Sequence, residues 1–142
     1  WESLGEFLAL AESFAHLSRT KGNAKAQVLA DTLNLASGKL MDNKKSPGRK
    51  VGELDNAGTH AYLTLYWAQE LAAQNDDQEI KDRFAPVAQE LEAKTDVIFE
   101  ELNASKGQAK DIGGYYNPDD EKVKVAMRPS ATFNSIVDSL SN

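Results

Sequence analysis

Apolar residues recur every three or four positions along most of this chain, which places them on one face of an α-helix. The first run consists of Leu4, Phe7, Leu8, Ala11, Phe14 and Leu17. Ser3 precedes this run and Glu6 lies within it, and the pair has the form of a capping box. Gly22 directly follows Lys21 and is a typical helix stop. The pattern therefore predicts a first helix that ends by residues 21–22.

Two further helices are predicted from the same period. Asn23 can cap the first of them, which should end near residues 42–43. Its apolar positions are Val28, Leu29, Leu33, Ala36 and Leu40. Asp55 or Asn56 can cap the next helix, which contains the stretch AYLTLYWAQELAAQ at 61–74. Because this stretch is apolar over a wide arc, we expect a helix buried on more than one side.

The middle of the chain should be helical around a proline. Residues 76–77 are both Asp and begin a segment that runs from Gln78 to Phe84. Pro86 lacks an N–H group, so we expect the helix to kink or restart there. The apolar face of the continuation consists of Val87, Leu91, Ile98 and Leu102. Residues 106–107, Lys then Gly, should end it.

Glycines interrupt the pattern again at residues 113–114, and two short helices are expected after them. Asn117 followed by Pro118 reads as a cap and a first helical residue, with an end at Met127. Ser130 should cap a last helix with Phe133, Ile136, Val137 and Leu140 on its apolar face. The tyrosines at 115–116 could stack on a ligand, but such a pair after two glycines more often packs over an edge of the core, which is the expectation here. The prediction is an all-α fold of about six helices in an irregular bundle.

Composition narrows the function classes. A length of 142 residues suits one domain, and the net charge of -6 argues against nucleic acid as a partner. There are no cysteines, and no apolar run has the length of a membrane span. The two histidines, His16 and His60, lack any metal-ligand spacing, so we expect no zinc site. No nucleophile motif or pair of catalytic carboxylates stands out.

One loop opposes the acidic charge of the chain. In the stretch KKSPGRK, residues 44–50, four of seven residues are Lys or Arg. The fork of donors on Arg49 suits a phosphate group, and the lysines at 44, 45 and 50 would add positive field. Gly48 would let the backbone approach a ligand. A merely solvated loop between helices is the other interpretation, since charge runs usually face water.

Four stretches resemble the C-terminal part of the monomeric NADP-dependent isocitrate dehydrogenases. They are WESLGEFLALA at 1–11, SPGRKVGELDN at 46–56, DIGGYY at 111–116 and MRPSATFN at 127–134. The resemblance implies a bacterial cytoplasmic enzyme that acts in the tricarboxylic acid cycle and is connected with the glyoxylate bypass. Such an enzyme converts isocitrate to 2-oxoglutarate and reduces NADP with Mg²⁺ or Mn²⁺. It also implies that this chain is a fragment, residues 1–142, of a larger two-domain protein.

By this resemblance the chain contributes to cofactor binding and not to catalysis or metal binding. Arg49 would grip the 2′-phosphate of NADP. Trp1 matches the Trp of the family's Arg-Trp-Asp contact, and Glu2 stands at the position of its Asp. The catalytic, metal and isocitrate ligands would lie upstream, so we expect an isolated chain to be inactive. The segment would complete the domain that both ends of the parent chain form.

A second function class stays open on the sequence alone. The wide apolar helix faces would also suit a free-standing helical interaction module without catalysis. In that case residues 44–50 would be a solvated loop or an anionic docking patch. The length of the open reading frame before Trp1 distinguishes the two hypotheses.

Overall fold

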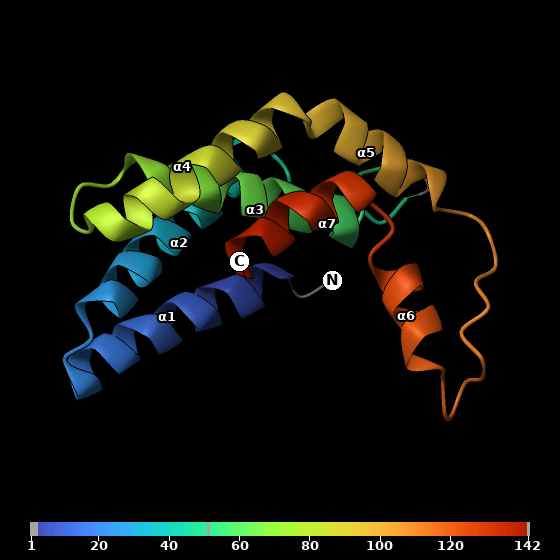
Figure 1. Ribbon diagram of the computed structural model, residues 1–142, viewed down its shortest axis with the longest axis horizontal. Helices are drawn as coiled ribbons and strands as arrows, with labels where there is room; N and C mark the ends of the chain where they lie inside the picture. The colour runs from blue at the N-terminus through green and yellow to red at the C-terminus, as the bar shows by residue number, and fades with distance from the viewer. Residues whose placement is uncertain (1–2, 51, 142) are drawn as a thin grey trace. The chain divides into compact units, whose positions relative to one another are not determined.

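The computed structural model describes residues 3–50 and 52–141, without the side chain of Ser3. The regular structure in this part of the chain is helical throughout, which confirms the all-α prediction (Figure 1). The helices are α1 (Ser3–Lys21), α2 (Ala24–Asp42), α3 (Asn56–Ala73), α4 (Gln78–Ala93), α5 (Thr95–Ala104), α6 (Asp120–Met127) and α7 (Ala131–Asp138), followed by the 3-10 turn η1 (Ser139–Ser141). The capping box expected at Ser3 lies outside the described side chains.

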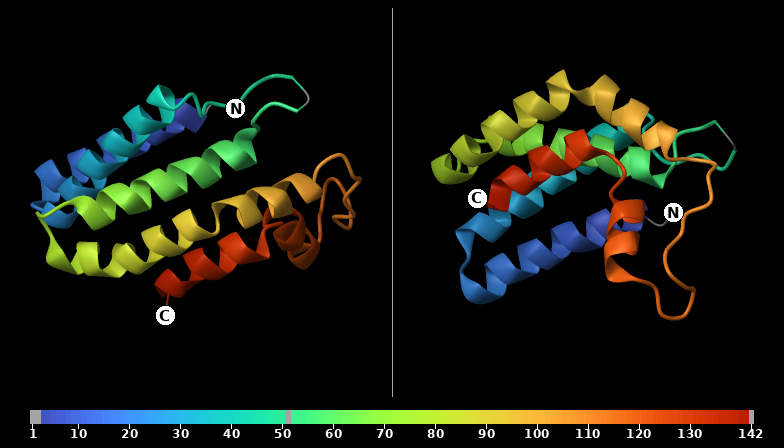
Figure 2. Two further views of the ribbon diagram at one scale, coloured as in Figure 1. Left: turned by 90° about the horizontal axis from the view of Figure 1, so that it is seen from above. Right: turned by 45° about the vertical axis from the view of Figure 1, so that its right-hand side comes forward.

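The chain divides into two compact units, Trp1–Glu92 and Ala93–Asn142. In the first unit α1 packs on α2, and α2 packs on α3. Successive helices of this unit run in opposite directions and are joined at their ends (Figure 2). Its core contains Val28, Leu71 and Ile80 from α2, α3 and α4, with Leu29, Trp67 and Phe84 packed around them. The predicted apolar faces of these helices therefore form one core.

Short polar side chains set the starts of α2 and α3 as predicted. Asn23 accepts a hydrogen bond from the backbone N–H of Ala26 at 3.1 Å. Asp55 accepts one from the N–H of Gly58 at 3.0 Å, which decides between the two caps proposed for α3. Each bond satisfies one of the unpaired donors in the first turn of a helix.

The wide apolar arc predicted for α3 is confirmed. Its buried residues are Gly58, Thr59, Ala61, Leu63, Leu65, Tyr66, Ala68 and Leu71. The face predicted for α1 is covered only in part, since Phe7 and Ala11 are buried while Leu8 and Leu17 are 45% and 40% exposed.

Of the kink or restart expected at Pro86, the restart is wrong, because α4 continues through this residue to Ala93. Pro86 removes the bond to the carbonyl of Asp82, but both residues are exposed, so water can bond that carbonyl. The break comes later, at Lys94, between α4 and α5. The apolar positions on either side of this break are all buried as predicted: Val87, Leu91, Ile98 and Leu102.

In the second unit α5 packs against α7, with Ile98, Leu102 and Ile136 buried. Ser130 caps α7 as predicted, accepting from the N–H of Phe133 at 3.0 Å. The cap predicted for α6 at Asn117 is wrong: Asp119 accepts from the N–H of Lys122 at 3.0 Å. Asp119 is also tied to the preceding loop, since its N–H donates to Ile112 O at 2.8 Å. None of the described helices is long and apolar enough to cross a membrane.

Candidate functional site

The basic loop joins α2 to α3 and extends beyond the ends of both helices (Figure 2). Two bonds fix its first part. The N–H of Lys45 donates to Leu40 O at 2.9 Å, and the carbonyl of Lys45 accepts from Thr59 Oγ1 at 2.9 Å. Thr59 is only 1% exposed and belongs to α3. The loop is therefore attached to both helices.

Lys45 is directed toward the protein and not toward solvent. Its Nζ lies 4.2 Å from the ring centroid of Tyr62, a cation–π contact. Burial raises the pKa of the neighbouring Tyr66 phenol, and the Lys45 charge partly opposes that rise. Of the three lysines expected to add field, Lys45 thus stabilises the base of the loop, while Lys44 and Lys50 are exposed.

Arg49 is exposed near the tip of the loop, where its backbone is held by an acid. The N–H groups of Arg49 and Lys50 both donate to Oε2 of Glu53, at 2.9 and 3.0 Å. A carboxylate that accepts two backbone N–H bonds is a strong local anchor. Glu53 is a functional candidate that the sequence analysis missed.

Gly48 has a different role from the one predicted for it. A Cβ on Gly48 would lie 2.2 Å from Oε2 and 2.6 Å from Cβ of Glu53. The space that the missing side chain leaves is occupied by Glu53. The glycine therefore admits an internal carboxylate.

The other two cofactor contacts predicted for this chain fall on its first two residues. Trp1 and Glu2 lie outside the described residues. Nδ1 of His60 donates to Asn56 O at 2.7 Å, and the ring packs edge-on to Phe7 with centroids 5.1 Å apart. Within the described residues no three His, Asp or Glu side chains cluster in a way that could hold a metal ion.

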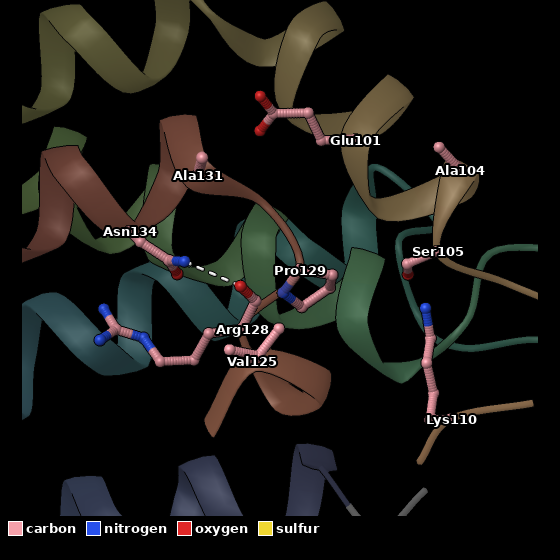
Figure 3. Close-up of a pocket in the computed structure, with 9 residues that line it drawn as sticks. All are labelled: Glu101, Ala104, Ser105, Lys110, Val125, Arg128, Pro129, Ala131 and Asn134. Carbon is pink, nitrogen blue, oxygen red and sulfur yellow. Dashed lines mark hydrogen bonds between the residues drawn. The ribbon is translucent and has the colours of Figure 1, made fainter. Parts of the chain in front are cut away.

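A hollow of about 440 Å³ lies within the second unit (Figure 3). Its lining is Glu101, Ala104, Ser105, Lys110, Val125, Arg128, Pro129, Ala131 and Asn134. Figure 3 shows the Glu101 carboxylate directed from α5 toward the first turn of α7. Glu101 accepts from Ser130 Oγ at 2.6 Å, and Arg128 pairs with Asp138 at 2.7 Å. These charged groups serve the packing of the unit.

The tyrosine pair does not pack over the core as expected. Tyr115 is 85% exposed and Tyr116 is 96% exposed. Their rings contact each other edge to face, with centroids 5.1 Å apart. Gly113 and Gly114 before them have φ values of +82° and +155°, a backbone conformation that favours glycine.

Comparison with known proteins assigns the family. The family model of monomeric isocitrate dehydrogenase matches residues 1–138. The chain belongs to this family. The matched residues include the basic loop at residues 44–50.

Similar proteins from several bacteria agree. The chain is 56% identical over 140 residues to isocitrate dehydrogenase (NADP) 2 of Colwellia maris. It is 54% identical over 140 residues to the NADP isocitrate dehydrogenase of Corynebacterium efficiens, and 54% over 135 residues to that of Azotobacter vinelandii. These matches cover 99%, 99% and 95% of this chain. The chain spans about a fifth of the length of these curated relatives, 19%, 19% and 18%.

Proposed function

We propose that this chain acts as the C-terminal segment of an NADP-dependent isocitrate dehydrogenase. In that enzyme isocitrate is oxidised and decarboxylated to 2-oxoglutarate while NADP is reduced, with Mg²⁺ or Mn²⁺ as the metal. The chain supplies Arg49 to the site for the 2′-phosphate of NADP, with Trp1 and Glu2 as further cofactor contacts. It completes the domain that both ends of the parent chain form.

The single observation that carries this proposal is the exposed Arg49 on an anchored loop. A guanidinium recognises a phosphate through two parallel donors, provided that its backbone is held in place. Here the loop is bonded to α2 and α3, and an internal carboxylate holds the backbone of Arg49. The similar proteins are named as isocitrate dehydrogenases of NADP, the cofactor that carries this extra phosphate.

The chemical step belongs to the rest of the parent enzyme in this proposal. The family resemblance places the isocitrate, metal and catalytic groups upstream of this segment. The isolated chain should therefore show no oxidation of isocitrate. Its partners are the remainder of the parent chain, NADP and isocitrate, in the bacterial cytoplasm, with neither nucleic acid nor membrane.

Steady-state kinetics of the full-length enzyme test this function. Arg49→Ala should raise the KM for NADP about ten- to a hundredfold, since a charge-assisted bond contributes about 1.5–3 kcal/mol. Turnover with NAD should change little, because NAD lacks the 2′-phosphate. Arg19→Ala, which removes an exposed cation paired with Glu12 in α1, is the matched control.

Equal losses with NADP and NAD in Arg49→Ala would contradict a role in phosphate recognition. A similar rise in KM for Arg19→Ala would show that only the net charge of the segment matters.

A further inference from the structure

Glu53 lies four residues after Arg49 and is itself exposed, yet it determines the shape of the loop tip. We propose that Glu53 is a positioning residue for NADP binding: its carboxylate fixes the backbone from which Arg49 presents its guanidinium. This inference rests on the proposed function of Arg49 and adds the residue that holds the backbone of Arg49 in place.

Hydrogen bonds join Glu53 to two consecutive residues, Arg49 and Lys50. Oε2 accepts from the N–H groups of Arg49 and Lys50 at 2.9 and 3.0 Å. The N–H of Glu53 in turn donates to Lys50 O at 3.1 Å. Glu53, Arg49 and Lys50 therefore form a closed turn, which fixes the backbone position from which the Arg49 side chain extends.

The glycine at 48 is required by this arrangement. Its φ is not in the left-handed region, so backbone conformation does not demand glycine there. Space does, because a Cβ would lie within 3 Å of Oε2, Cβ and Cδ of Glu53. The N–H of Gly48 donates to Leu54 O at 2.8 Å, which closes the loop one residue before Asp55, the cap of α3. The loop tip is thereby tied to the start of α3.

The negative charge of Glu53 makes the two explanations predict opposite changes in NADP affinity. A carboxylate beside a phosphate site repels the ligand, so charge alone predicts that removing Glu53 tightens NADP binding. Positioning predicts the opposite. Because Glu53 already occupies the N–H groups of Arg49 and Lys50, a phosphate must be recognised by side chains and not by these amides.

Three variants of the full-length enzyme test the proposal. Glu53→Ala should raise the KM for NADP about tenfold, the effect of losing one charged anchor, while kcat and turnover with NAD stay the same. Glu53→Gln keeps an acceptor oxygen and should recover most of the affinity. Gly48→Ala should behave like Glu53→Ala, since its Cβ displaces the carboxylate. Asp42→Asn removes a nearby exposed charge that makes none of these bonds and is the control.

Arg49→Ala, assayed beside these variants, separates the two proposals. If Arg49→Ala weakens NADP binding and Glu53→Ala does not, the positioning role of Glu53 is overturned while the proposed function of Arg49 stands. The same conclusion follows if Glu53→Ala tightens NADP binding. If Arg49→Ala shows no loss specific to NADP, the proposed function fails. The variant that combines Arg49→Ala with Glu53→Ala should bind NADP no more weakly than Arg49→Ala alone. A loss of NAD turnover in Glu53→Ala would indicate a general structural role and would also overturn the proposal.

Discussion

Thr32 shows how a single hydroxyl can serve two helices. Its Oγ1 donates to Val28 O in α2 at 2.7 Å and accepts from Nε1 of Trp67 in α3 at 3.0 Å. Thr32 is only 2% exposed. Since a buried indole N–H without a partner is costly, this hydroxyl fixes where Trp67 can lie in the core.

Removing this hydroxyl should destabilise the chain. Thr32→Val keeps the shape of the side chain but leaves the Trp67 N–H without an acceptor, at a cost of about 1–3 kcal/mol. Urea unfolding of the purified chain measures the change. Thr20→Val is the matched control, because the exposed Thr20 makes the same kind of bond to His16 O at 2.8 Å in α1. Equal losses in the two variants would refute a role for the contact with Trp67.

At the residue scale, the sequence identifies Arg49 but not its anchor. The sequence places the guanidinium of Arg49 in a cationic loop, and the family resemblance implies which ligand it binds. The bond from Glu53 back to the N–H of Arg49 depends on the path of a loop without helical periodicity. A glycine five residues before an acid is too common a pattern to predict this bond.

The helix pair α5 and α7 is joined by Glu101. Its two carboxylate oxygens accept from Ser130 Oγ, Thr132 N and Thr132 Oγ1, all at the start of α7. The bonds from Ser130 and then from Thr132 lower the pKa of Glu101. Ser130 thus donates to Glu101 while its oxygen caps α7.

The stability from these bonds should depend on pH. Because the pKa of Glu101 is lower in the folded chain, its contribution is present above the unfolded pKa of about 4.3 and is lost as pH falls through the folded value. The free energy of unfolding of wild type should exceed that of Glu101→Gln near about pH 7, and the gap should narrow as the pH falls below the unfolded pKa.

The neighbouring Glu100 provides the control for this pH dependence. It is exposed and makes none of the bonds to α7, so Glu100→Gln should change the gap less. A gap between wild type and Glu101→Gln that stays constant or widens toward acid would contradict the assigned role.

At the element scale, most helix starts and faces follow from local chemistry and are predicted correctly. Caps such as Asn23 and Ser130 act within one turn, so the sequence contains the whole interaction. The two errors involve prolines. The sequence does not show that α4 continues past Pro86. Nor does it show that the cap of α6 shifts from Asn117 to Asp119, which also bonds to Ile112 across the preceding loop.

For the whole molecule, charge and family membership lead to the same loop. The chain has a net charge of -6, yet four of the residues 44–50 are cationic. The structure ties this loop to both α2 and α3, and the family match covers it. Trp1 and Glu2, the other predicted contacts, lie outside the described residues, so their role rests on the resemblance alone.

The most direct test of the central claim is competition by fragments of the cofactor. Adenosine 2′-monophosphate carries the phosphate that Arg49 is proposed to bind, and adenosine 5′-monophosphate does not. In the full-length enzyme, Arg49→Ala should weaken inhibition by the 2′-phosphate compound about ten- to a hundredfold and leave inhibition by the 5′-phosphate compound unchanged. Unchanged inhibition by the 2′-phosphate compound would contradict the claim that Arg49 binds the 2′-phosphate group.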